Sequence, residues 1–272
     1  MLSHPFKTKT FLVSVYIWSV IVLTTPVLFL LYMIIWFLAF PFDRNHVVSH
    51  YFTFLWTRIY LTCNPEWKLH IATRKRIDPA KTYILVSNHQ SIIDIALLLQ
   101  LRINFKWVSK IELAPIPFVG WVIWMNNHIL VKRGDKKSVL KMADACRETL
   151  ARGISVFMFP EGTRSTDGKI QAFKEGAFIL AKENQVPILP VVIDGGGQAL
   201  SRHSFLFTPG VRFHVHVLDE ISIETINKME LPELMSYTHR QMTDELNIIR
   251  NGTGYGKHTF RHTAENGIPV GQ

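Results

Sequence analysis

A long apolar run near the N-terminus constrains this chain more than any other feature. Residues 11–40 read FLVSVYIWSVIVLTTPVLFLLYMIIWFLAF and contain no ionisable side chain apart from two tyrosines. A soluble helix is apolar along one stripe only, whereas this segment is apolar on every side, as membrane-embedded helices are. The run is too long for the core of a signal peptide, and no small-residue cleavage site follows it. We therefore expect residues 1–45 to form a retained membrane anchor.

Pro26 lies near the middle of the apolar run and leaves two arrangements open. Because proline interrupts helical hydrogen bonding, the run could form two short helices that enter and leave the membrane by the same face. A single helix of this length would instead exceed a hydrocarbon core of roughly 30 Å unless it were tilted. The flanking basic residues show no clear inside-versus-outside asymmetry and so suit a hairpin: Lys7, Lys9, Arg44 and Arg58.

The overall composition indicates one folded domain besides the anchor. The 272 residues are 48% hydrophobic and carry a formal net charge of +9. This excess of positive charge favours an anionic partner, which could be nucleic acid, a membrane surface or a substrate. No helix-turn-helix, zinc-finger or RNA-recognition signature occurs, so we expect membrane lipid as a partner and no nucleic acid. Cys63, Cys146 and the scattered histidines predict neither a disulfide framework nor a metal site.

Beyond the anchor, strand-like and helix-like segments alternate, as is typical of an α/β sheet. The strands are expected at residues 82–87, 105–109, 154–159, 187–193 and 211–218. The helices are expected at residues 92–101, 136–152, 174–184 and 231–249. The apolar stretch 111–131 contains two prolines and a glycine, and is too interrupted to be one spanning helix. We predict a linker over residues 46–80, a folded domain over 81–250 and a loosely ordered tail over 251–272.

The sequence NHQSIID at residues 88–94 directly follows the first expected strand. It places the imidazole of His89 at a strand-to-helix junction and the carboxylate of Asp94 just over one helical turn later. Such a pair suits a general base, since the carboxylate can orient the ring and stabilise the charge that develops on proton abstraction. Taken alone, the pattern is also compatible with a helix-capping histidine and a solvated aspartate.

A second polar segment, FPEGTRS at residues 159–165, also comes directly after an expected strand. Its glycine and backbone N–H groups can approach an anion, and Arg164 can bind a phosphate with two parallel hydrogen bonds. Taken alone, the segment could equally be a polar turn with a solvated arginine.

The two segments, with Lys110-x-Glu112-Leu113 and Gly120 between them and Val186-Pro187 after them, occur in a distinctive order. This pattern resembles the 1-acyl-sn-glycerol-3-phosphate acyltransferase family of the glycerophospholipid acyltransferase superfamily. The resemblance implies an α/β fold, with a glycerolipid acyltransferase-like mixed sheet flanked by helices, and makes residues 81–250 the catalytic domain.

The resemblance also implies roles for individual residues. His89 would be the general base and Asp94 its orienting carboxylate. The chain departs from the family pattern in one place. Arg133 matches the arginine of a family motif, but the residues just before Arg133 differ from that motif. Residues 186–190 would be structural and would line the acyl chain. The residues implied to bind the substrate phosphate are Lys110, Arg133, Glu161, Gly162, Thr163 and Arg164.

The reaction implied by the resemblance is direct transfer of a fatty acyl group onto the 2-hydroxyl of lysophosphatidic acid, which gives phosphatidic acid. The donor would be acyl-CoA or acyl carrier protein loaded with an acyl chain, and no further cofactor is expected. The enzyme would lie at the inner (cytoplasmic) membrane with its catalytic domain facing the cytosol. Two alternatives stay open, namely acylation of glycerol 3-phosphate or another lysolipid, and a non-enzymatic membrane lipid-binding protein. A serine hydrolase is disfavoured because no G-x-S-x-G elbow is present.

Overall fold

The N-terminal apolar run forms one continuous helix. The computed structural model describes residues 4–74, 77–201, 204–252 and 261–262. Helix α1, His4–Ala39, passes through Pro26 without a break, so the alternative of two short helices divided at this proline is wrong. The hydroxyls of Thr24 and Thr25 both contact the Tyr60 hydroxyl, at 3.2 and 2.8 Å. These contacts hold α1 against the following helix next to Pro26, which lacks a backbone N–H.

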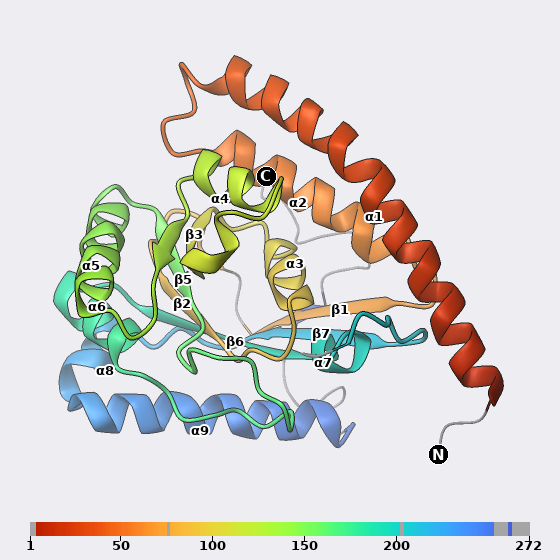
Figure 1. The fold of residues 1–272 in the computed structure, drawn as a ribbon. Helices are drawn as coiled ribbons and strands as arrows, with labels where there is room; N and C mark the ends of the chain where they lie inside the picture. Colours follow the sequence, from red (N-terminus) through yellow and green to blue (C-terminus); the bar gives the residue numbers. More distant parts are fainter. Residues whose placement is uncertain (1–3, 75–76, 202–203, 253–260, 263–272) are drawn as a thin grey trace.

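Helix α2, Val47–Thr62, returns beside α1 (Figure 1). Asp43 caps the start of this helix, since its carboxylate accepts hydrogen bonds from the first backbone N–H groups of the helix, at 2.6 to 3.3 Å. Strand β1, Lys68–Thr73, follows and pairs in parallel with β7, Arg212–Val217. Residues 46–80 were expected to be a linker, but they contribute a helix and a sheet strand, so that part of the predicted domain division is wrong.

A single mixed sheet organises the folded domain. Its strand order is β4-β3-β5-β2-β6-β7-β1-β8. The first five strands run parallel, β7 runs antiparallel to β6, and β8 runs antiparallel to β1. The remaining strands are β2 (Ile84–Ser87), β3 (Phe105–Lys110), β4 (Ile129–Val131), β5 (Ser155–Met158), β6 (Ile188–Asp194) and β8 (Arg261–His262).

Helices cover both faces of the sheet (Figure 1). Successive side chains of β2 point to opposite faces, so Leu85 joins one apolar cluster while Ile84 and Val86 join the other. The first cluster includes residues of α3, and the second includes residues of α5, α6 and α9. The helices and the single 3₁₀ segment of this part are α3 (Ile93–Leu99), η1 (Ile111–Leu113), α4 (Val119–Met125), α5 (Lys136–Ala151), α6 (Gly176–Asn184), α7 (Gly196–Ala199), α8 (Ile223–Lys228) and α9 (Leu231–Arg250).

These elements confirm the predicted α/β fold with a mixed sheet flanked by helices. Each expected strand and helix is present, and none of its ends is shifted by more than two residues. The interrupted stretch 111–131 divides into η1, α4 and β4, as its prolines and glycine require. Most of the tail predicted for residues 251–272 lies outside the described residues.

Candidate active site

The predicted site residues lie at one edge of the sheet because they follow the carboxyl ends of parallel strands. His89 comes after β2 and Glu161 after β5, and these two strands are neighbours. Lys110 ends β3 and pairs in register with Val131, the last residue of β4, two positions before Arg133. In open α/β sheets this edge is where ligands usually bind, since the loops that follow adjacent parallel strands meet there.

His89 and Asp94 form a hydrogen-bonded pair. The Nδ1–H group of His89 donates to Asp94 Oδ2 at 2.9 Å. Asp94 is fully buried, whereas the His89 side chain remains 14% exposed. Because a carboxylate only accepts hydrogen bonds, it holds the proton on Nδ1 and leaves the Nε2 lone pair of the neutral ring available. This is the arrangement that a general base requires.

The Asp94 carboxylate is fixed by its own backbone contacts. It lies in the first turn of α3, and its Oδ2 also accepts the N–H groups of Gln90 and Ser91, at 2.6 and 2.8 Å. Asp94 Oδ2 therefore binds both the backbone of the His89 loop and the imidazole ring. The short spacing between His89 and Asp94 makes this possible, since the loop turns back over the start of the helix.

The imidazole of His89 is also held from the β5 side. Its ring stacks on the ring of Phe159, with centroids 3.8 Å apart and an interplanar angle of 14°. Phe159 in turn packs edge-on against Phe157 in the core. With a carboxylate at Nδ1 and an aromatic ring on one face, His89 has little rotational freedom.

Glu161 joins the two motifs through the backbone. Its Oε1 accepts the N–H of His89 at 2.7 Å, and its Oε2 accepts the N–H of Gln171 at 2.8 Å. Burial raises the pKa of this carboxyl to about 7, against the lowering effect of the two N–H donors. Both oxygens are thus engaged inside the protein, and a carboxylate repels an anion. Glu161 therefore holds the backbone of His89, and its contact with the substrate phosphate stays a prediction.

The segment after Glu161 wraps back onto the His89 loop. Gly162 adopts a left-handed conformation with φ of +68°, and a Cβ at this position would lie only 2.9 Å from the Lys174 side chain. The N–H of Ser165 then donates to the His89 carbonyl at 2.8 Å. Thr163 is exposed and Arg164 is half-buried between these two fixed points.

Lys110 and Arg133 are exposed at the ends of β3 and β4. β3 adjoins β5, whose C-terminal loop carries Arg164. The three basic side chains therefore follow three neighbouring strands, so this edge can attract an anionic group.

Comparison with known proteins agrees with the fold. Residues 68–194 match the family model described as Acyltransferase, and this span contains both motifs. Over these residues the chain is similar to that acyltransferase family. Its predicted resemblance to the 1-acyl-sn-glycerol-3-phosphate acyltransferases is thereby confirmed.

Acyltransferases from photosynthetic organisms are among its relatives. The 1-acyl-sn-glycerol-3-phosphate acyltransferase of Chlamydomonas reinhardtii is 36% identical over 185 residues, covering 67% of this chain and 54% of the relative. The chloroplastic enzyme LPAT1 of Arabidopsis thaliana is 37% identical over 161 residues, covering 59% of this chain and 44% of the relative. The chain thus spans about half the length of these curated relatives.

A solved structure extends the likeness to nearly the whole chain. The 1-acyl-sn-glycerophosphate acyltransferase PlsC of Thermotoga maritima superimposes with a TM-score of 0.75 over 90% of this chain and 97% of that one. At 23% sequence identity, this likeness confirms the fold of the chain.

Several residues that support the candidate site could not be assigned a role from the sequence. The Asn88 side chain exchanges two hydrogen bonds with the backbone of Ile193 in β6, at 2.7 and 2.8 Å. Asp194, at the end of β6, accepts a hydrogen bond from Arg250 of α9 at 2.8 Å. Asn88 was visible as part of the first motif, and Asp194 as a polar residue ending a strand. Nothing in the sequence near Arg250 points to the site, since its partner is distant along the chain.

Proposed function

We propose that this acyltransferase transfers a fatty acyl group from an acyl thioester to the 2-hydroxyl of lysophosphatidic acid and so produces phosphatidic acid. The observation that carries the proposal is the His89–Asp94 hydrogen bond at the ligand-binding edge of the sheet. Relatives named 1-acyl-sn-glycerol-3-phosphate acyltransferases support the choice of acceptor.

In this mechanism His89 Nε2 takes the proton of the acceptor hydroxyl. The hydroxyl oxygen then attacks the thioester carbonyl carbon, and the tetrahedral intermediate collapses by breaking the carbon–sulfur bond. The proton on Nε2 returns to the departing thiolate, so the ring ends neutral. Asp94 stabilises the imidazolium while it exists, and it keeps Nε2 turned toward the substrate throughout. No acyl-enzyme and no further cofactor enter the cycle.

The acceptor phosphate is assigned to the basic residues beside this base. Arg164 is the principal candidate because its planar guanidinium can bind two phosphate oxygens at once. Lys110 and Arg133 add positive charge from the two strand ends farther along the same edge. Exposed Thr163 can add a hydroxyl donor, and the left-handed turn at Gly162 brings the backbone close.

The contacts between α1 and the folded domain support one membrane arrangement. Helix α1 is long and apolar enough to cross a membrane, by length and composition. However, Lys9 pairs with Glu66 at 2.9 Å near one end, and the Trp36 indole donates to the Met125 carbonyl at 3.0 Å near the other. These contacts are about 40 Å apart at roughly 1.5 Å per residue. A perpendicular span would carry the polar domain into the hydrocarbon, so we infer that α1 lies along one leaflet, on the cytoplasmic face of the inner membrane.

The activity is tested with purified full-length protein in phospholipid vesicles. Labelled acyl-CoA and acyl carrier protein loaded with the same chain would each be offered with lysophosphatidic acid, glycerol 3-phosphate or lysophosphatidylcholine. We expect labelled phosphatidic acid from lysophosphatidic acid with at least one donor, and none with His89→Ala. Preferential acylation of glycerol 3-phosphate or lysophosphatidylcholine would contradict the acceptor, and equal product from His89→Ala would contradict the mechanism.

The orientation is tested by cysteine labelling of sealed membranes. Lys7→Cys and Phe42→Cys lie on either side of the apolar run 11–40, and Phe42 is 86% exposed at the turn between α1 and α2. Both positions should react with an impermeant maleimide from the side on which the catalytic domain lies. Reaction of position 7 only from the opposite side would establish a transmembrane span.

A further inference from the structure

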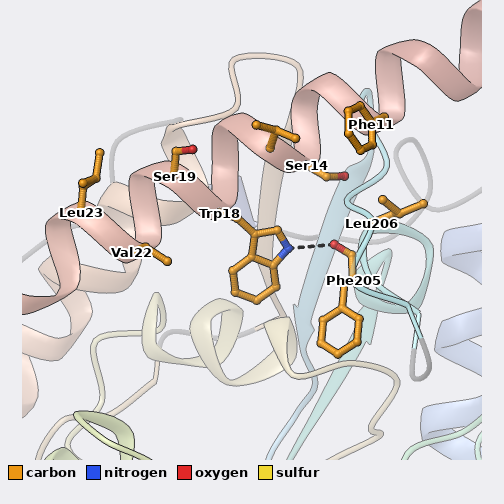
Figure 2. Close-up of a pocket in the computed structure, with 9 residues that line it drawn as sticks. Phe11, Ser14, Trp18, Ser19, Val22, Leu23, Phe205 and Leu206 are labelled. Atoms are coloured by element: carbon orange, nitrogen blue, oxygen red, sulfur yellow. Dashed lines mark hydrogen bonds between the residues drawn. The ribbon is translucent and has the colours of Figure 1, made fainter.

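An apolar groove lies where the first half of α1 meets the loop that precedes β7. Figure 2 shows residues of α1 on one side of this groove and residues of the 204–207 loop on the other. The groove has a volume of about 540 Å³, and its lining includes Phe11, Trp18, Val22, Leu23, Phe205 and Leu206. It therefore exposes hydrocarbon contributed by both the anchor helix and the folded domain.

The 204–207 loop presents large apolar side chains outward. Phe205 is 78% exposed and Leu206 is 48% exposed, and on the facing helix Leu23 is 72% exposed. Single exposed apolar residues are ordinary, but a continuous patch of this kind marks an interaction surface. The patch continues the outer face of α1, whose apolar side chains require lipid in any case.

Several polar groups of the loop are paired within the protein. The Trp18 indole donates to the Phe205 carbonyl at 2.8 Å, and the N–H of Phe207 donates to Ser14 Oγ at 2.8 Å. The N–H of Leu206 donates to a side-chain hydroxyl within the loop at 2.9 Å. Since an unpaired N–H or C=O group is costly in hydrocarbon, this pairing is what allows irregular backbone to enter a bilayer.

The loop is also attached firmly to the anchor helix. The Trp18 ring lies 6.4 Å from the ring of Phe205 and 5.4 Å from that of Phe207, measured between centroids. Trp18 therefore holds the loop on α1 by two ring contacts and one hydrogen bond. Tryptophan is favoured at the boundary between lipid headgroups and hydrocarbon, which fits a position at the base of an inserted loop.

We propose that the 204–207 loop is a second membrane contact, which inserts Phe205 and Leu206 among the acyl chains of the leaflet that holds α1. The occupant of the groove is the hydrocarbon of bilayer phospholipids, because the groove is continuous with the outer face of α1. The inference rests on the membrane placement of α1 given above, and it adds a contact made by the folded domain itself. Two separated contacts prevent the domain from rolling about the α1 axis and so hold the His89 edge at a constant height over the lipid.

Depth-dependent fluorescence quenching tests the proposal. A polarity-sensitive fluorophore would be attached to Leu206→Cys, to Leu23→Cys on α1, and to Leu140→Cys on α5, each in full-length Cys63→Ser protein. Cys146 is retained because it is fully buried. Leu140 is the matched control, since it is an apolar residue that is 65% exposed on a helix of the opposite sheet face. The vesicles contain phosphatidylcholine and phosphatidylglycerol, with bromine on the acyl chains, and iodide serves as the aqueous quencher.

The expected result is that bromolipid quenches the label at position 206 at least half as strongly as the label at position 23. The label at position 140 should be quenched by iodide and not by bromolipid. Quenching at position 23 but not at position 206 would overturn the loop proposal alone. Absence of bromolipid quenching at both positions would contradict the placement of α1 as well. A label at position 206 shielded from both quenchers would identify a protein partner, a second copy of this chain included, and would also overturn the proposal.

A paired substitution gives a second readout. Phe205→Ser with Leu206→Ser should lower the acylation rate on vesicle-borne lysophosphatidic acid by about 3- to 10-fold and leave the rate in detergent micelles within about twofold, because micelles impose no fixed orientation. Leu140→Ser is the control and should leave both rates unchanged. Equal rates in vesicles for the paired variant and the wild type would contradict a functional role for the insertion. Since quenching needs no turnover, it separates failure of this inference from failure of the proposed activity.

Discussion

Gly196 lies directly against the carboxylate of Asp94. A Cβ added to Gly196 would be 2.1 Å from Asp94 Oδ1. Among the described residues this buried oxygen has no hydrogen-bond partner, whereas Oδ2 accepts three. The turn between β6 and α7 therefore packs against the Asp94 carboxylate and restricts it to one position beside His89.

The contact between Gly196 and Asp94 predicts that alanine substitutions at two neighbouring glycines have very different effects on activity. Gly196→Ala should displace the carboxylate and lower kcat by about 100-fold or more, since the His89 hydrogen bond depends on that position. Gly197→Ala is the matched control, because its Cβ would come no closer than 3.4 Å to Gln90, an ordinary contact. Initial rates and melting temperatures of both variants would be measured. Equal activity of the two variants would contradict the tight packing.

The His89–Asp94 pair predicts graded losses of turnover. His89→Ala should reduce kcat by about 10² to 10⁴, the usual contribution of general acid–base catalysis. Asp94→Asn should cause a smaller but still large loss, because an amide no longer fixes the proton on Nδ1. Single-turnover rates at saturating donor and acceptor would measure both effects. Retention of half the wild-type rate by His89→Ala, in a protein with unchanged melting temperature, would exclude His89 as the base.

The two backbone contacts of Glu161 predict a kinetic signature for its amide variant. Glu161→Gln replaces one acceptor by an NH₂ group, which must face either the His89 or the Gln171 N–H. Loss of one such buried hydrogen bond is worth about 1–3 kcal/mol. We therefore expect kcat to fall by about 10- to 100-fold while the KM for lysophosphatidic acid changes little. A raised KM at unchanged kcat would instead place Glu161 in the acceptor site.

The raised pKa of Glu161 predicts how stability depends on pH. In the unfolded chain this carboxyl titrates at its ordinary value of 4.5, whereas burial raises its pKa to about 7 in the fold. The folded state therefore binds more protons between these values, so the contribution of Glu161 is fully present below pH 4.5 and is lost as the pH rises through about 7. Melting temperatures from pH 4.5 to 8 should fall more steeply for the wild type than for Glu161→Gln. Parallel curves would contradict the raised pKa.

Arg164 is predicted to act on acceptor binding. Arg164→Ala should raise the KM for lysophosphatidic acid by about 10- to 100-fold, corresponding to about 1.5–3 kcal/mol for a charged hydrogen bond, while donor KM changes little. Arg164→Lys should recover part of the loss, because an ammonium keeps the charge without the planar fork. Initial rates against acceptor concentration at saturating donor measure this. A fall in kcat alone would mean that the phosphate binds elsewhere.

The sequence by itself determined the features that depend on neighbouring residues. The apolar run at residues 11–40 predicts a membrane element because every face of such a helix is apolar. The alternation of strands and helices predicted the α/β sheet, and the spacing of His89 and Asp94 was enough to predict their pairing, since both lie within one strand-to-helix turn.

Only the tertiary structure decided what depends on contacts between distant segments. The role of Glu161 follows from its bond to the His89 backbone, and that of Gly196 from its position over Asp94. Continuity of α1 through Pro26 likewise reflects packing against α2, which outweighs the local effect of proline. The local sequence reflects helix and strand propensity and the spacing of residues along the chain. The contacts of Glu161, Gly196 and α1 instead form when the sheet and its helices assemble. One local sequence pattern is compatible with many such tertiary contacts.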